Sequence, residues 1–247
     1  MAADIILRTE HLTRRFGGFT ALNDVSVEFE RGKLTSIIGP NGAGKSTFFN
    51  VLSGSFAPSA GRVVFDGSDV SGLGQHRFAR LGVAKSFQIT NVFPAFDALE
   101  NVRIALQARV ARLNFWSRRD TLALAPRARE LLQLVGLGQH ALRPARELAH
   151  GQQRALEIAI ALAADPKLLL MDEPTAGMSP EETLTMMALI VRLAAERTIV
   201  LVEHKMKMVM GISDRIVVLN HGELLATGTP ADIRANDEVR RVYLGKH

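Results

Sequence analysis

One nine-residue stretch, from Gly39 to Thr47, constrains this chain more than any other feature. It reads Gly-Pro-Asn-Gly-Ala-Gly-Lys-Ser-Thr and holds the spacing G-x-x-x-x-G-K-[ST] of a phosphate-binding loop. Its three glycines permit positive φ and close backbone approach, so successive N–H groups can surround an anion. Leu34–Ile38 is typical of the strand that precedes such a loop. The residues from Thr47 to Leu52 are typical of the helix that follows it. A chance glycine-rich turn would lack both flanks, so we expect a nucleotide phosphate site.

Two side chains of this loop have distinct chemical tasks. Lys45 is expected to reach the β- and γ-phosphates, and the Ser46 hydroxyl to ligate Mg²⁺. The remaining residues offer backbone N–H donors and the start of a helix dipole. The predicted phosphate-contacting set is Gly39, Pro40, Asn41, Gly42, Ala43, Gly44, Lys45, Ser46 and Thr47.

Composition limits the class of protein without choosing a partner. The 247 residues are 47% hydrophobic and 22% charged, as in ordinary globular proteins, and include no cysteine. The N-terminus lacks the pattern of a signal peptide, and no apolar run reaches the roughly 18–20 residues that span a bilayer. We therefore expect a soluble or peripheral protein. A net charge of +5 leaves nucleic acid, anionic lipid and nucleotide open as partners.

Two apolar strands end in groups that suit phosphate chemistry. Leu168–Met171 leads directly to Asp172 and Glu173, and Thr198–Val202 is followed by Glu203 and His204. A carboxylate at such a strand end holds Mg²⁺ in P-loop proteins, which assigns that task to Asp172. On an extended chain Glu173 points the opposite way and would polarise an attacking water. The alternative for Asp172 and Glu173 is a solvated turn, and the alternative for His204 is a structural histidine. Both alternatives are less favoured because each of these residues follows a strand that the sequence predicts to be buried.

The rest of the chain alternates strands and helices, which predicts an α/β fold. Residues 5–38 carry β signals, and residues 25–30 alternate apolar and polar positions, as in a half-exposed antiparallel sheet. Within residues 5–38, Phe16 suits either packing or stacking on a flat ring. Residues 97–165 read as helical, and the basic and aromatic stretch 112–119 is either a solvated connection or a contact surface. Ser179 and Glu182 form a capping box around Pro180, and helical signals run from residue 230 to 244.

Together these motifs resemble the nucleotide-binding subunits of ATP-binding-cassette (ABC) transporters over essentially the whole chain. The resemblance implies a RecA-like mixed sheet core, an antiparallel β subdomain and a helical subdomain. Residues 1–96 and 166–227 would form the catalytic core with its antiparallel part, 97–165 the helical subdomain, and 228–247 a C-terminal extension.

The resemblance also assigns roles by position. Phe16 matches the aromatic that stacks on adenine, and residues 39–47 match the Walker A loop. Gln88 matches the Q-loop glutamine at the metal and water site, Glu173 the catalytic glutamate and His204 the switch histidine. The implied metal ligands are Ser46, Gln88 and Asp172, and the implied catalytic groups are Lys45, Gln88, Glu173 and His204. The family signature, which acts on a second subunit's ATP, falls on Leu148, Ala149, His150, Gly151 and Gln152.

Two departures from the family pattern bear on hydrolysis. Ala149 and His150 stand where Ser and Gly are usual, so no serine hydroxyl is available for the γ-phosphate. Backbone N–H groups from Gly151 onward would have to replace it. Ser179 stands where the loop after Glu173 usually ends in Asp, which removes a carboxylate from the expected dimer interface.

The chain most resembles the ATPases of branched-chain (hydrophobic) amino-acid importers. The segment from Glu203 to Asp214, the ending from Gly228 to Gly245 and the 108–128 insertion with Trp116 carry this likeness. It implies ATP and Mg²⁺, a second ATP-binding subunit, two transmembrane permease subunits and, indirectly, a periplasmic amino-acid-binding protein. The site of action would be the cytoplasmic face of the inner membrane, with no nucleic acid. Urea or amide import, lipopolysaccharide export, a soluble nucleic-acid-linked ABC ATPase and a P-loop kinase are the alternatives.

Overall fold

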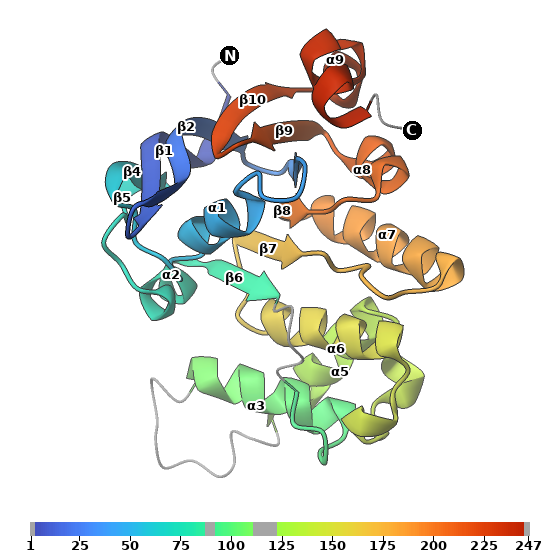
Figure 1. Ribbon diagram of the computed structural model, residues 1–247. Coiled ribbons are helices and arrows are strands. Elements are labelled where there is room, and N and C mark those ends of the chain that lie inside the picture. Colours follow the sequence, from blue (N-terminus) through green and yellow to red (C-terminus); the bar gives the residue numbers. More distant parts are fainter. Residues whose placement is uncertain (1–2, 87–91, 111–122, 245–247) are drawn as a thin grey trace.

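The computed structural model describes residues 3–86, 92–110 and 123–244. Its strands gather into two sheets, and most of its helices lie on the two sides of the larger one (Figure 1). Gln88, Trp116 and residues 112–119 lie outside the described residues, so the expectations for them stay untested. The division into subdomains also remains a prediction.

The larger sheet carries the phosphate loop. Its strands lie in the order β10-β9-β3-β8-β7-β6, and neighbours pair in parallel except at the edge pair β9 and β10. The carboxyl ends of the parallel strands therefore meet along one edge. The strands are β3 (Leu34–Ile38), β6 (Val83–Ser86), β7 (Leu168–Asp172), β8 (Thr198–Val202), β9 (Arg215–Asn220) and β10 (Glu223–Gly228).

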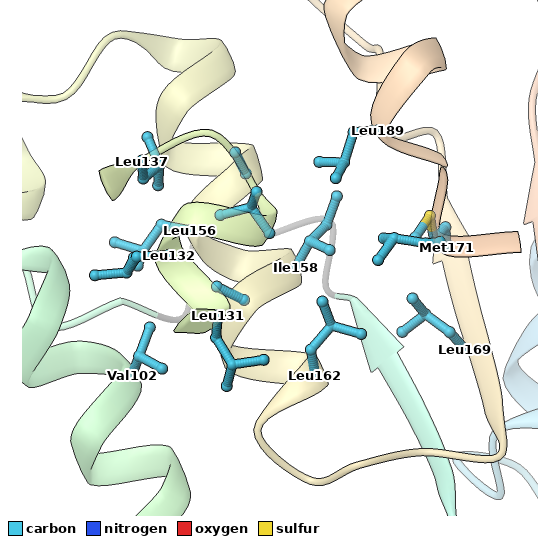
Figure 2. Packing of buried hydrophobic residues seen from close by; sticks show 14 of the residues in the cluster. Val102, Leu131, Leu132, Leu137, Leu156, Ile158, Leu162, Leu169, Met171 and Leu189 are labelled. Atoms are coloured by element: carbon cyan, nitrogen blue, oxygen red, sulfur yellow. The ribbon is translucent and has the colours of Figure 1, made fainter. Parts of the chain in front are cut away.

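The central strands are apolar at consecutive positions because both faces of the sheet are covered. Leu169 and Met171 of β7 pack against helices on one side, whereas Leu168 and Leu170 pack into a second core on the other side. Figure 2 shows the first of these cores, in which Leu169 and Met171 lie beside Ile158 of the neighbouring helix. The three leucines and the one methionine of this strand are fully buried.

Helices of the first core follow the 97–165 stretch that reads as helical in the sequence. They are α3 (Ala98–Val110), α5 (Ala125–Leu134) and α6 (His150–Leu162), and the short 3-10 helices η1 (Gly138–His140) and η2 (Ala145–Glu147) lie between α5 and α6. Helix α7 (Pro180–Ala194) connects β7 to β8 and buries Met186, Leu189, Ile190 and Leu193. Helices α1 (Lys45–Leu52) and α2 (Gln75–Leu81) lie toward the second core, where Phe48 and Phe49 are fully buried.

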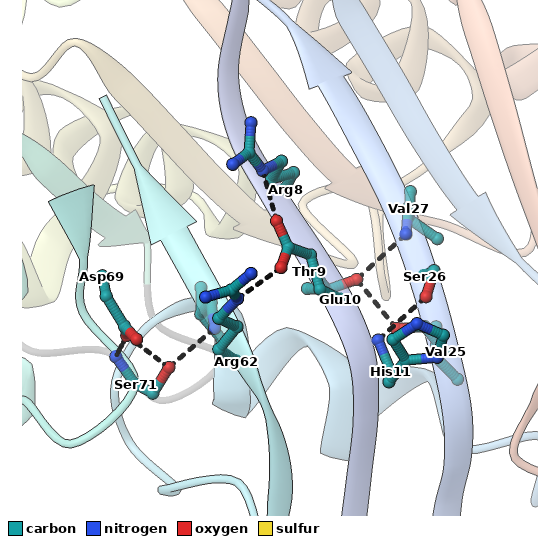
Figure 3. Close-up of polar contacts among 11 residues, drawn as sticks. Arg8, Thr9, Glu10, His11, Val25, Ser26, Val27, Arg62, Asp69 and Ser71 are labelled. Atoms are coloured by element: carbon teal, nitrogen blue, oxygen red, sulfur yellow. Dashed lines mark hydrogen bonds and ion pairs between the residues drawn. The ribbon is translucent and has the colours of Figure 1, made fainter. Parts of the chain in front are cut away.

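The smaller sheet is antiparallel, as the alternation at residues 25–30 predicts, whereas Leu34–Ile38 of the same predicted stretch pairs in parallel within the larger sheet. Its order is β2-β1-β4-β5, from β1 (Ile5–Phe16), β2 (Phe19–Glu30), β4 (Ala60–Phe65) and β5 (Ser68–Asp69). The register of β1 shifts between Thr9 and Leu12, where His11 has a positive φ of 50°. Thr9 stabilises this irregularity, because its hydroxyl donates to the Val25 carbonyl and accepts from the Val27 N–H, both at 3.0 Å (Figure 3).

A charged cluster joins the two sheets. Asp66 follows β4 and accepts from the guanidinium of Arg31 at 2.7 Å and from Lys167, just before β7, at 2.5 Å. These two cations hold the pKa of the Asp66 carboxyl below its usual range, with Lys167 the larger cause. The antiparallel sheet is thus tethered beside the start of the strand that ends in Asp172.

Residues 230–244 are helical, as the sequence predicts, and are divided into several short helices. Helices α8 (Met206–Ile212), α9 (Pro230–Ala235), α10 (Asp237–Val239) and the π-helical turn η3 (Arg240–Leu244) cover β9 and β10. The break falls at Asn236, whose backbone is extended and whose side chain accepts from the N–H groups of Glu238 and Val239. Asparagine favours such caps over helix interiors because its side chain competes for nearby backbone donors. Among the described residues we find no helix with the length and apolar character needed to cross a membrane.

Candidate nucleotide site

The phosphate loop joins β3 to α1 at the carboxyl edge of the larger sheet. Gly39 has φ of 152° and Gly44 φ of 92°. A Cβ added at Gly39 would lie 2.1 Å from the Leu219 carbonyl oxygen, and one at Gly44 would lie 2.8 Å from that of Ala21. Both positions therefore require glycine, because neither the conformation nor the space admits a side chain.

Lys45, the first residue of α1, reaches back over the loop. Its ammonium donates to the carbonyl oxygens of Gly39 at 2.7 Å and Pro40 at 2.9 Å. Burial lowers the pKa of this ammonium, and the charges of Glu173 and Asp172 oppose that shift. Lys45 therefore interacts electrostatically with Glu173 and Asp172. The loop of Lys45 follows β3 and the two carboxylates follow β7, and β8 lies between these strands.

Asp172 ends β7 and is partly buried. Burial raises the pKa of its carboxyl above the usual range; Lys85 and Lys45 oppose this, whereas Glu173 adds to it. Lys85, on β6, was given no role in the sequence analysis. Its ammonium donates to the Asn50 side chain at 2.7 Å and lies 5.1 Å from the Phe49 ring centroid. The sequence shows only that Lys85 lies in a short predicted strand. The fold pairs this strand with β7, which ends in Asp172.

Glu173 corrects one expectation. The chain is not extended there, because Glu173 has φ of 46°, in the left-handed region. Its N–H still donates to the Val202 carbonyl at 2.9 Å, and its own carbonyl accepts from Ala176 at 3.0 Å, which closes a turn. The left-handed residue therefore ends the strand and turns the chain. The side chain of Glu173 is 32% exposed.

His204 lies beside Glu173 from the neighbouring strand. Its Nδ1 is 3.7 Å from Glu173 Oε1, and its side chain is 55% exposed. The two predicted residues are therefore adjacent and open to solvent at the carboxyl edge. This placement suits a carboxylate that orients water and an imidazole that reaches a phosphate from the same side.

Glu203 is a further residue beside the site for which the sequence alone predicts no role. Its carboxylate is completely buried and accepts from the N–H groups of His204 at 3.0 Å and Lys205 at 3.3 Å. It also accepts from both the N–H and the hydroxyl of Thr175, which lies two residues after Glu173. One buried carboxylate thus joins the loop after Glu173 to the loop that carries His204.

The signature residues form the start of α6. Ala149 precedes the helix, and its N–H donates to the Gln152 side chain at 3.0 Å. The Gly151 N–H, which the sequence analysis offered to a phosphate, donates to Glu182 Oε1 at 3.3 Å within the same subunit. Glu182 would therefore compete with a phosphate for the Gly151 N–H, which is the donor that the sequence predicts for the phosphate. The segment is otherwise well placed, since His150 and Gly151 are exposed or half-exposed.

The described residues suit a Mg²⁺ ion that is bound mainly through its nucleotide. Among them no group of three or more His, Cys, Asp and Glu could cage a metal ion. Mg²⁺ commonly keeps several waters and takes only one or two carboxylates plus substrate phosphates. The hydroxyl of Ser46 and the carboxylate of Asp172 are oxygen donors of the kind that this arrangement needs. Gln88, the third predicted ligand, lies outside the described residues.

Phe16 ends β1 opposite Phe19 and is 40% exposed. Its ring meets Phe56 edge to face, with centroids 5.4 Å apart. One part of the Phe16 ring therefore packs against Phe56 and another part is exposed, while stacking on a base stays a prediction.

Comparison with known proteins places this site in a family. The profile of ABC transporters matches residues 22–176, and the profile of branched-chain amino acid ATP-binding cassette transporters matches residues 223–247. The chain belongs to the ABC transporter family of ATP-binding proteins, and its predicted α/β P-loop class is confirmed.

Within that family, the chain is similar to branched-chain amino acid transport ATP-binding proteins. It is 44% identical to the high-affinity protein BraF of Pseudomonas aeruginosa and 41% identical to LivG of Escherichia coli, with 98% of each chain covered in both cases. An ABC transporter cassette solved in its ADP conformation matches with a TM-score of 0.85 at 29% identity, over 98% of this chain and 99% of that one. A dimeric cassette bound to ADP and Pi matches with a TM-score of 0.76 at 28% identity, over 91% and 98%.

Proposed function

We propose that this chain is the ATP-hydrolysing subunit that powers import of branched-chain or other hydrophobic amino acids across the bacterial inner membrane. It would bind at the cytoplasmic face to two permease subunits, which receive cargo from a periplasmic binding protein. The match of residues 223–247 to a profile of branched-chain amino acid cassettes carries the choice of cargo, because the phosphate loop alone is common to all ABC ATPases.

The chain's own residues supply most of the chemistry. Lys45 exchanges its bonds to two loop carbonyls for the phosphates of ATP, and the loop N–H groups surround the same oxygens. Glu173 orients the attacking water and accepts its proton, while His204, adjacent to it, contacts the γ-phosphate. Ser46 and Asp172 would hold Mg²⁺, which when bound would supply neutralisation of charge on the phosphate oxygens.

A second subunit completes each site in this proposal. Residues 148–152 of one copy face the ATP held by the loop of the other, and this requires Glu182 to release the Gly151 N–H or share it. ATP binding closes the dimer, hydrolysis reopens it, and the Gln88 region passes the motion to the permease. Existing dimeric cassette structures, one with ADP and Pi, support this arrangement for the family.

The test is a reconstitution of the intact complex. The tagged chain is purified with its membrane partners, placed in liposomes with the matching binding protein, and assayed for ATP hydrolysis with each amino acid. We expect stimulation by a branched-chain amino acid, loss of turnover by 10²-fold or more (roughly, for a general base) in Glu173→Gln, and an ATP-trapped dimer of that variant by light scattering. Lys45→Ala, with loop donors but no ammonium, should neither trap the dimer nor hydrolyse ATP.

Specific outcomes would favour the alternatives. Stimulation by urea, an amide or lipopolysaccharide would replace the cargo while leaving the ATPase assignment intact. Stimulation by RNA or DNA without membrane subunits would favour a nucleic-acid-linked ATPase. Wild-type turnover in Glu173→Gln would remove the assignment of Glu173 itself.

A further inference from the structure

An arginine packs against the aromatic ring to which we assign adenine stacking. The guanidinium carbon of Arg14 lies 4.5 Å from the centroid of Phe16 and 5.4 Å from that of Phe56. The two rings are themselves 5.4 Å apart with an interplanar angle of 78°. Three side chains from two segments therefore form one compact cluster.

The geometry of this cluster leaves part of Phe16 uncovered. Groups on opposite faces of the Phe16 ring would lie nearly twice as far apart as Arg14 and Phe56 do. Arg14 and Phe56 consequently approach the ring from neighbouring directions. The 40% exposure of Phe16 agrees with a ring that is supported on one side and open on the other.

Arg14 is itself held in place. Its Nη1 donates to the Ala57 carbonyl at 2.8 Å, and the residue is half-buried. Its Nε is buried without a hydrogen-bond partner. Burying a guanidinium nitrogen without a partner costs free energy, which the other contacts of Arg14 must offset. These contacts are the two aromatic rings and the Ala57 carbonyl, and together they set the position of the side chain.

We propose that Arg14 is a positioning residue for adenine binding: it fixes the Phe16 ring so that the open face receives the base. Arg14 makes no contact with the nucleotide in this scheme and acts only through Phe16. A fixed ring loses less conformational freedom when the base stacks on it, so the contribution appears in affinity and not in the chemical step. The proposal rests on the assignment of ATP as the ligand and of Phe16 as the stacking residue.

The test separates the base from the phosphates. We expect Arg14→Ala to raise KM and Kd for ATP by roughly two- to five-fold with kcat unchanged, and to leave binding of Mg²⁺-tripolyphosphate, which has no base, unchanged. Arg14→Lys should restore part of the affinity, because it keeps the cation without the planar fork. Arg15→Ala is the matched control, since Arg15 is exposed and the structure shows its backbone N–H, and not its side chain, donating to Ser59.

A double-mutant cycle shows whether Arg14 acts through Phe16. In a Phe16→Ala background, Arg14→Ala should have no further effect on KM. Equal losses for ATP and tripolyphosphate, or a full additional loss in that background, would overturn the proposal in favour of a general structural role. An unchanged KM in Arg14→Ala would overturn it as well. If the wild-type chain binds tripolyphosphate but not ATP, the assigned ligand is wrong and the proposed function fails with it.

Discussion

Asp172, the metal ligand in our proposal, shows the cost of placing a carboxylate at the end of a buried strand. Burial raises the pKa of its carboxyl, and the nearby charge of Glu173 raises it further, while Lys85 and Lys45 only partly offset this. For an acid whose pKa is higher in the fold than in the unfolded chain, the fold is favoured at low pH. That advantage is lost as the pH rises through the raised pKa.

Removing this charge should therefore stabilise the nucleotide-free protein. Asp172→Asn is expected to raise the free energy of unfolding at neutral pH, and the gap should close at pH values below the ordinary carboxyl range, where both side chains are neutral. ATPase activity should fall at the same time, because the amide is a weaker metal ligand. Urea unfolding at several pH values measures the gap, with Asp237→Asn, an 87% exposed acid, as control. A gap that does not change with pH would contradict this account.

At the scale of elements, the start of α7 is linked to the start of α6. Ser179 caps the helix by accepting from the Glu182 N–H at 3.2 Å, and Glu182 accepts in return from the Ser179 N–H at 2.9 Å. The other oxygen of Glu182 accepts from Gly151 at the start of α6. These bonds hold the pKa of the Glu182 carboxyl below its usual range, the Ser179 N–H being the largest cause. The cap therefore also positions the signature segment.

Two substitutions at Ser179 separate capping from the missing carboxylate of the family pattern. Ser179→Ala removes the acceptor and should cost about 1 kcal/mol in the free energy of unfolding. Ser179→Asp keeps a strong N-cap and should remain within about 0.5 kcal/mol of the wild type, while restoring the usual acid. Urea titrations of both variants measure this difference. Equal destabilisation by both would show that the hydroxyl acts through something other than capping.

At the scale of the whole molecule, Asp66 connects the antiparallel sheet to the core sheet through Arg31 and Lys167. All three side chains are 36% exposed or more, so water and salt screen these ion pairs. Asp66 has a positive φ of 49°, a conformation that Asn also tolerates. The lowered pKa of its carboxyl means that this stabilisation is present at neutral pH and is lost as the pH falls through its folded value.

Asp66→Asn consequently tests the charge without disturbing the turn. We expect a loss of less than about 1 kcal/mol per ion pair, which diminishes at high salt. Thermal unfolding at low and high salt measures it, with Glu130→Gln as the control because its partner Arg127 lies one turn away on the same helix. A loss that is independent of salt would assign Asp66 a role other than charge pairing.

Much of this architecture could be predicted from the sequence because buried strands and glycine-rich loops have local patterns. The apolar run Leu168–Met171 indicated a strand covered on both faces, and Ser179 with Glu182 indicated a helix start; both predictions are confirmed. The left-handed turn at Glu173 was missed because a non-glycine residue gives no sign of positive φ. The links from Glu203 to Thr175 and from Lys85 to Asn50 were missed because these partners lie far away in the chain, and only the fold brings them together.

The bonds between Lys45 and its own loop have a consequence for turnover. Before ATP arrives, the ammonium already has two carbonyl partners, at 2.7 and 2.9 Å, so the loop keeps a cation inside it and retains its curvature. In this proposal nucleotide binding breaks these bonds, so the affinity for ATP is lower than it would be if the Lys45 ammonium had no hydrogen-bond partners beforehand. Departure of the products returns them, which eases release. If Lys45 binds the phosphates as we propose, the same side chain would also limit how long the spent nucleotide stays bound.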